Sequence, residues 1–224
     1  MSDTVQPSMR RVLDEELVQV RELALRMAEF VEAAIPRAIA ALVQADRSQC
    51  DAVIAGDAEL NALQVELREL CTVTILTQAP VDGDLRRLLA YLHMSTELER
   101  MGDHCVSIAR IGSQLVDEPA DRDLSDLGRM AELCRVQVSE MLDAAVDGDA
   151  EAARTVASHD DRVDRLYRRI FDEEVRACST GEDTGSRATR LTMAAHHLER
   201  IADRVTNVGE DIVYLETGAI EELG

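Results

Sequence analysis

Tryptophan is absent from this sequence of 224 residues, and aromatic residues together make up only 2% of it. Sheets favour aromatic and β-branched side chains, whereas aliphatic side chains suit the seams between packed helices. Hydrophobic residues still amount to 46%, so the core must be built from Leu, Val, Ile, Ala and Met. Four prolines and eleven glycines leave few places for turns. These scarcities predict an all-α protein with long helices.

Positive charge is scarce as well, because 24 Lys and Arg residues stand against 44 Asp and Glu residues and the net charge is −20. Nucleic acids and anionic lipids are bound mainly through Lys and Arg contacts with phosphates, so we expect no nucleic-acid partner. Cations and basic faces of other proteins fit this surface better.

No apolar run approaches the roughly 18 residues that span a bilayer. The first residues also lack the apolar core of a signal peptide. We therefore expect a cytoplasmic protein without direct membrane insertion.

The sequence also lacks the patterns of common catalytic and zinc sites. Its five cysteines are scattered, odd in number and never in a Cys-x-x-Cys pair, which argues against a disulfide framework or a zinc finger. Cys105 and Cys134 fall on apolar helical stripes and are expected to be buried thiols. We find no Gly-rich phosphate loop, no Gly-x-Ser-x-Gly motif and no Cys/His dyad. The protein is therefore not expected to be an enzyme.

Apolar residues recur at helical spacing along almost the whole chain. This periodicity predicts six long helices, at about 9–46, 48–78, 84–115, 124–146, 149–178 and 186–217. The third and sixth have the clearest seams, in which apolar residues step by three and four as in antiparallel bundles. These seams contain Met94, Leu98, Met101, Cys105, Ile108, Gly112 and Leu115, and Leu191, Ala194, Leu198, Ile201, Val205, Val208, Ile212 and Leu215.

An internal duplication relates the two halves of the chain. LeuGluArgMetGlyAsp at 98–103 recurs as LeuGluArgIleAlaAsp at 198–203, a shift of 100 positions. Earlier helices repeat with a shift of 103, so that ValGlnAlaAsp at 43–46 matches ValAspGlyAsp at 146–149. The sequence thus predicts two tandem pseudo-symmetric three-helix bundles, residues 1–117 and 118–224.

Pairs of oxygen-bearing side chains recur at four-residue spacing in both halves, and residues four apart share a helix face. If the second and third helices of one half pack together, up to four such side chains could converge, and oxygen clusters suit hard or borderline cations. A solvated acidic face is the alternative, since repulsion of about 0.2–0.5 kcal/mol per pair does not demand a ligand. The pairs are Glu99 with Asp103 and Glu199 with Asp203 on the third helices, and Asp57 with Asn61 and Asp160 with Asp164 on the second.

Histidines add little to this hypothesis. His196 precedes Glu199 by three residues and shares its face, but its counterpart in the first half is Thr96, so the duplication does not support it as a ligand. No histidine has the Glu-x-x-His spacing of di-iron bundles, which argues against a ferritin-like oxidase.

Two three-helix units with Glu-x-x-x-Asp on the third helix and Asp-x-x-x-Asp/Asn on the second resemble the PhoU family. ProValAspGlyAspLeuArg at 80–86 also resembles that family's segment before the third helix, and the resemblance covers residues 10–217. Asn61 departs from the pattern, because an acid would be the better ligand there.

The resemblance implies a negative regulator of the phosphate-starvation response. Such a protein is an adaptor that couples the ATPase subunit of a phosphate ABC transporter to a sensor histidine kinase. It also implies metal ions, iron first and Zn, Mn or Mg as alternatives, held by Glu99, Asp103, Glu199 and Asp203, with Asp57, Asp160 and Asp164 behind them. Long amphipathic helices favour a homodimer. A metal-storage or redox bundle and a metal-free scaffold are the competing hypotheses.

Overall fold

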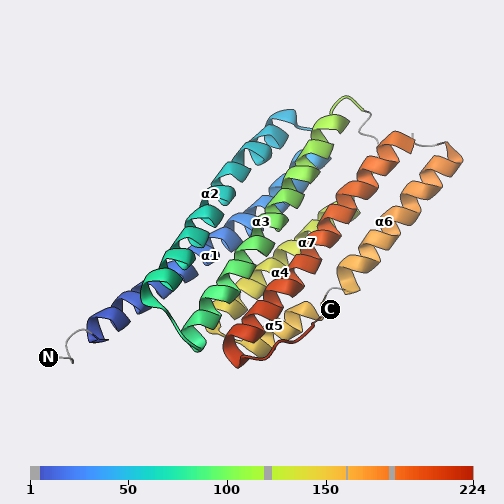
Figure 1. Ribbon diagram of the computed structural model, residues 1–224. Helices are drawn as coiled ribbons and strands as arrows, with labels where there is room; N and C mark the ends of the chain where they lie inside the picture. The colour runs from blue at the N-terminus through green and yellow to red at the C-terminus, as the bar shows by residue number, and fades with distance from the viewer. Residues whose placement is uncertain (1–5, 119–122, 160, 182–184, 224) are drawn as a thin grey trace.

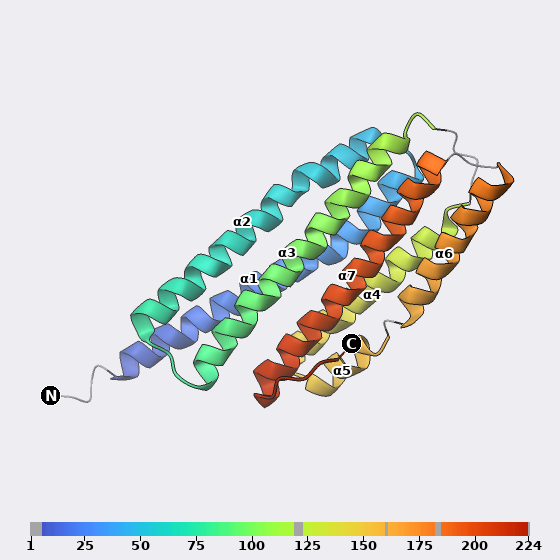
Figure 2. The same ribbon diagram turned by 45° about the vertical axis from the view of Figure 1, so that its right-hand side comes forward.

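The computed structural model describes residues 6–118, 123–159, 161–181 and 185–223, with side chains from residue 10 onward. Seven helices and no strand occur within these residues, so the all-α prediction is confirmed. They form an elongated bundle whose helices follow one long axis, with α2 and α6 on opposite flanks (Figures 1 and 2). The helices are α1 (Gln6–Val43), α2 (Arg47–Gln78), α3 (Gly83–Leu115), α4 (Ser125–Asp147), α5 (Ala150–Ala157), α6 (Asp161–Thr180) and α7 (Gly185–Thr217).

The fifth predicted helix is divided into α5 and α6, which corrects the prediction of one helix over 149–178. The Ser158 hydroxyl donates to the Thr155 carbonyl at 2.7 Å, and the His159 N–H turns back to the Val156 carbonyl at 3.0 Å. Serine favours helix ends because its side chain competes for backbone groups. The matched residues Ala55 and Gly56 stay inside α2. The architecture is still two three-helix units, with the middle helix of the second in two pieces.

The two units share one continuous apolar core. Between the units, α1 packs against α4 and α3 against α7, while α2 and α6 lie outside these contacts. The predicted seams of α3 and α7 are buried, apart from Leu215, which is partly buried. The division of the chain at residue 117 stays a prediction.

The repeated turns before α2 and α5 have the same construction. Asp46 caps α2 by accepting from the Gln49 N–H at 3.1 Å, and Asp149 caps α5 by accepting from two N–H groups at 3.0 Å. The residue before each cap has positive φ, +50° at Ala45 and +64° at Gly148. Glycine takes this conformation freely, whereas alanine is strained in it. The first turn therefore carries a strain that the second avoids.

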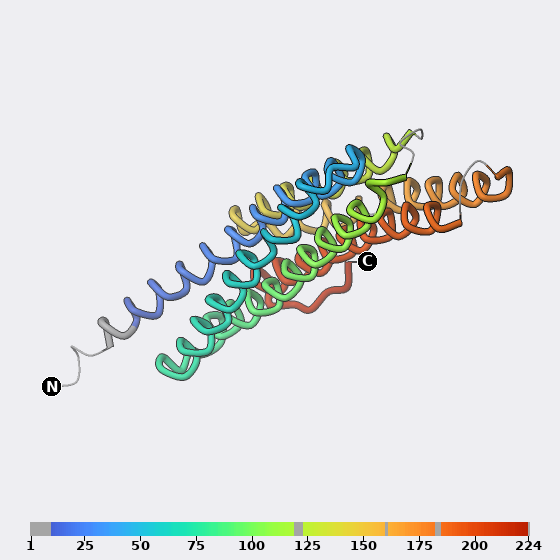
Figure 3. Tube along the Cα trace, turned by 90° about the horizontal axis from the view of Figure 1, so that it is seen from above, coloured from blue at the N-terminus to red at the C-terminus, as the bar shows by residue number. Residues whose placement is uncertain are grey.

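The chain after α7 folds back over the second unit (Figure 3). Glu221 pairs with Arg154 on α5 at 2.8 Å, and the Leu223 N–H donates to the Glu210 carboxylate on α7 at 3.0 Å. Cys105 and Cys134 are buried thiols, as predicted. In the described part of the chain, no helix combines the length and apolarity needed to cross a bilayer.

Candidate functional site

The predicted acidic cluster of the first unit lies where α2 meets α3. Gly102 allows this close approach, because a Cβ there would lie 2.2 Å from the Leu60 side chain and 3.7 Å from Asp57 Oδ1. Asp57 Oδ2 accepts from Asn61 Nδ2 at 2.8 Å, whereas Asp57 Oδ1 is buried and has no hydrogen-bond partner. Glu99 and Asp103 follow the same face of α3. One carboxylate oxygen is therefore held in the helix junction without a donor.

The carboxylates of this junction repel one another. Burial, then the charges of Asp103 and Asp57, raise the pKa of Glu99. Burial, then the charge of Asp57, raise the pKa of Asp103. Arg100, next to Glu99 in the chain, pairs instead with Glu97 at 3.5 Å. Arg100 and Arg68 at Glu99, and Arg110 at Asp103, offset only part of these shifts. The site thus holds an excess of negative charge, which a bound cation would relieve.

Two of the matching acids of the second unit are paired with arginines. Arg200 pairs with Asp203 at 2.6 Å, and Arg168 pairs with Asp164 at 3.3 Å. Asp160 lies outside the described residues. The two units therefore repeat the acidic sequence pattern without repeating its electrostatic environment.

Glu199 is the second-unit acid that most resembles the first-unit cluster. Burial, then the charge of Asp203, raise its pKa, and Asp164 adds to this effect. Its buried Oε2 lies 3.0 Å from His196 Nδ1, an ion-pair distance that lacks hydrogen-bond geometry. His196 thus faces the acidic site, where the sequence spacing placed it.

The donor atoms of the first unit fit a hard or borderline cation in chemistry, because they are carboxylate oxygens and one of them is buried without a hydrogen-bond donor. These carboxylates are not, however, arranged closely enough to coordinate one ion together. Within the ranges that the structure describes, no three His, Cys, Asp or Glu side chains are gathered closely enough to hold a metal ion. The metal ligands named from the sequence accordingly stay predictions.

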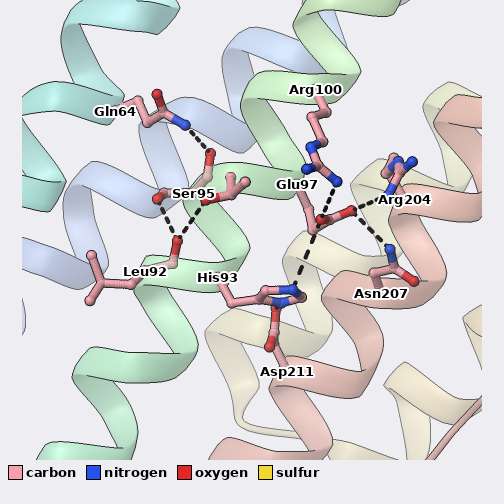
Figure 4. A network of polar contacts seen from close by, with 10 residues as sticks. Gln64, Leu92, His93, Ser95, Glu97, Arg100, Arg204, Asn207 and Asp211 are labelled. Atoms are coloured by element: carbon pink, nitrogen blue, oxygen red, sulfur yellow. Dashed lines mark hydrogen bonds and ion pairs between the residues drawn. The ribbon is translucent and has the colours of Figure 1, made fainter.

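A second polar cluster joins the two units, and sequence reasoning missed it. Figure 4 shows Glu97 of α3 reaching toward α7, where its Oε2 accepts from Arg204 at 3.1 Å and from Asn207 at 2.9 Å. The Glu97 side chain is only 3% exposed. One turn away, His93 Nδ1 lies 2.7 Å from Asp211 Oδ2. Burial raises the pKa of Asp211 to about 7 and outweighs the opposing contact with His93.

The signal that could have found this cluster is the position of charged residues on the seams. Glu97 follows Met94 by three and precedes Met101 by four, and Arg204 stands in the same relation to Ile201 and Val208. A charge at such a position is buried and needs a partner. The partner of Glu97 lies on the other unit, however, and the sequence does not show which positions of α3 and α7 are in contact.

These features define a tandem-repeat helical bundle with an acidic face on each unit. The sequence model of the "PhoU domain" family matches residues 24–112 and 127–212, one segment in each unit. The "Phosphate-specific transport system accessory protein PhoU homolog" of Clostridium acetobutylicum is 31% identical over 93% of this chain and 96% of its own length. The homolog of the same name from Caulobacter vibrioides is 33% identical over 93% of this chain and 90% of its own length.

Solved structures agree with the sequence comparisons. The crystal structure of PhoU from Pseudomonas aeruginosa is similar with a TM-score of 0.86 and 30% identity, covering 92% of this chain and 99% of that one. The structure of the phosphate transport system regulatory protein PhoU from Streptococcus pneumoniae has the same TM-score at 27% identity, covering 93% and 99%. The chain belongs to the PhoU family, as its motifs indicated.

Proposed function

We propose that this protein is an accessory regulator of a phosphate transport system and restrains the phosphate-starvation response when phosphate is abundant. The observation that carries the proposal is membership of the PhoU family over both units, together with relatives named as accessory proteins of phosphate-specific transport. Its family is regulatory rather than enzymatic, so its action is binding.

The proposed partners are the ATPase subunit of the phosphate transporter and a sensor histidine kinase. The protein is proposed to bind both of them in the cytoplasm. A net charge of −20 favours basic faces on both partners. An adaptor shifts a kinase toward its inactive state only if it binds that state more tightly. The protein is also proposed to form a homodimer, which sedimentation analysis would test.

The proposal includes a metal ion at the first-unit cluster of Asp57, Glu99 and Asp103. Support comes from the buried Asp57 oxygen without a donor and from the raised pKa values of Glu99 and Asp103. When bound, the cation would neutralise their mutual repulsion. The second unit is the weaker candidate, because Asp164 and Asp203 already pair with arginines.

The regulatory proposal is tested by a phosphate-starvation reporter in the native host grown in abundant phosphate. The strains are a deletion, the restored gene, the restored gene with Glu99→Ala and Glu199→Ala, and a control with Glu66→Ala and Glu69→Ala. The control removes two exposed acids of α2 and so matches the change in charge. Reporter output should rise on deletion and return to baseline with the restored gene and the control. A deletion that leaves the reporter silent contradicts the proposal.

Metal content after native purification tests the site separately. Asp57→Asn with Glu99→Gln should lose metal, whereas Glu66→Gln with Glu69→Gln should keep it. Wild-type protein without bound metal would favour the metal-free scaffold. Oxidation of ferrous iron by the wild-type protein would favour the storage or redox bundle.

A further inference from the structure

Two histidines from different units face each other across the junction of α3 and α7. His104 Nδ1 lies 3.1 Å from His197 Nδ1, and the ring centroids are 5.3 Å apart with the planes tilted by 39°. Both side chains are partly buried. Asp103 belongs to the α2–α3 junction, so His104 contacts a different neighbour from the acid beside it.

The internal repeat shows which pair of residues occupies the equivalent position in the other half of the junction. The shift of 100 turns position 97 into 197 and position 104 into 204, so the Glu97–Arg204 contact is the repeat equivalent of the His197–His104 contact. The first of these contacts is a complementary ion pair at 3.1 Å. The His197–His104 contact instead places two imidazole rings against each other. Two facing imidazole nitrogens share one proton between them or share a cation.

The distance between the nitrogens suits a shared cation. Two imidazole ligands of a tetrahedral zinc ion, each about 2.0–2.1 Å from the metal, lie about 3.3 Å from each other. Imidazole nitrogen favours zinc, nickel and copper over the harder cations that carboxylates select.

We propose that His104 and His197 form a two-histidine site for a borderline divalent cation, Zn²⁺ above all, which links α3 of the first unit to α7 of the second. Water completes the coordination, because among the described residues no third His, Cys, Asp or Glu joins the pair. The site is independent of the carboxylate cluster. Because the ion bridges two units that are apart in the unfolded chain, it stabilises the folded protein.

Calorimetric titration of chelator-treated protein with ZnCl₂ tests the proposal. The background carries Glu99→Gln and Glu199→Gln, which removes one carboxylate from the acidic cluster of each unit. His104→Gln and His197→Gln should each lose one equivalent of zinc or bind it at least tenfold more weakly. His159→Gln is the matched control, because His159 is similarly half-buried but belongs to the contact with Glu140. Zinc should also raise the Tm of the background and control proteins only.

Zinc binding that is equal in the background protein, His104→Gln and His197→Gln would overturn the proposal. Absence of zinc binding from the background protein would overturn it as well. A second measurement does not depend on the folding of the variants. One equivalent of Cu²⁺ added to the background protein should give an electron paramagnetic resonance spectrum with coupling to two imidazole nitrogens, and an oxygen-only spectrum would contradict the site.

Discussion

Glu97 of α3 and Arg204 of α7 form an ion pair of 3.1 Å at the junction of the two units, with side chains 3% and 17% exposed. Asn207 donates a further hydrogen bond to the same carboxylate oxygen of Glu97 at 2.9 Å. This contact fixes the register between the units, because sliding α3 along α7 would leave the Arg204 charge without Glu97 and leave Glu97 with Arg100 of its own helix.

Glu97→Ala is expected to lower the free energy of unfolding by about 3–5 kcal/mol, because it leaves the Arg204 charge uncompensated. Glu97→Met combined with Arg204→Met should recover most of this loss, since apolar side chains of similar volume replace the pair. Urea denaturation measures both. Glu132→Ala, which removes an exposed partner of Arg135, should cost no more than about 1 kcal/mol. Equal losses for Glu97→Ala and Glu132→Ala would contradict this account.

Gly102→Ala is expected to destabilise the protein by about 1–3 kcal/mol, because the new methyl group overlaps the fully buried Leu60 side chain. Gly128→Ala is the matched control. No atom lies within 4 Å of the added Cβ there, so it should stabilise α4 by about 0.5–1 kcal/mol through helix propensity alone. Thermal unfolding should show opposite shifts in Tm. Stabilisation by both changes would show that α2 and α3 have room to separate.

Ala45→Gly should stabilise the protein by about 1 kcal/mol, because Ala45 has a φ of +50° that glycine adopts without strain. The second unit provides the reciprocal experiment. Gly148→Ala should lose a similar amount at a φ of +64°, where the new methyl group also crowds the Glu216 carboxylate. Chemical denaturation of both variants checks the pair. A loss of stability for Ala45→Gly would mean that flexibility of the unfolded chain outweighs the turn strain.

Asp211→Asn should stabilise the protein increasingly as pH rises from about 4 to about 7. Burial raises the pKa of Asp211 to about 7 from an unfolded value of 3.8, so the folded state binds more protons than the unfolded state in this range. Wild-type stability is therefore lost as pH rises through the folded pKa. Asparagine has no charge to bury and keeps an oxygen that accepts from His93. Above pH 7 the gain should approach about 4 kcal/mol, measured by denaturation at pH 5 and pH 8. A gain in stability that does not depend on pH would mean that it does not come from the ionisation of Asp211.

The helices and their buried faces were predictable from the sequence, because helical periodicity is a local property. Leu98 and Ile201 are buried where their spacing placed them. The break between α5 and α6 was not predicted. It depends on whether Ser158 bonds to the backbone, and the matched Ala55 in the first unit has no such group.

The candidate site was predictable only in part. The four-residue spacing identified Glu99 and Asp103 as a pair, and the structure places Asp57 close enough to raise the pKa of both. Spacing did not reveal that Arg200 and Arg168 neutralise the matching acids, because side-chain rotamers decide such contacts. Contacts between α3 and α7 depend on register, so Glu97 with Arg204 and His104 with His197 became visible only in three dimensions.

The difference between those two contacts makes the halves of the chain non-interchangeable. In a protein assembled from two copies of the first unit, Glu97 would face a histidine at both ends of the junction. Two copies of the second unit would place an arginine against a histidine twice. Neither combination recreates the Glu97–Arg204 pair. The two halves of the chain therefore carry different, complementary residues at their junction, as the two subunits of a heterodimer do. Separately expressed halves should associate with each other in preference to their own copies.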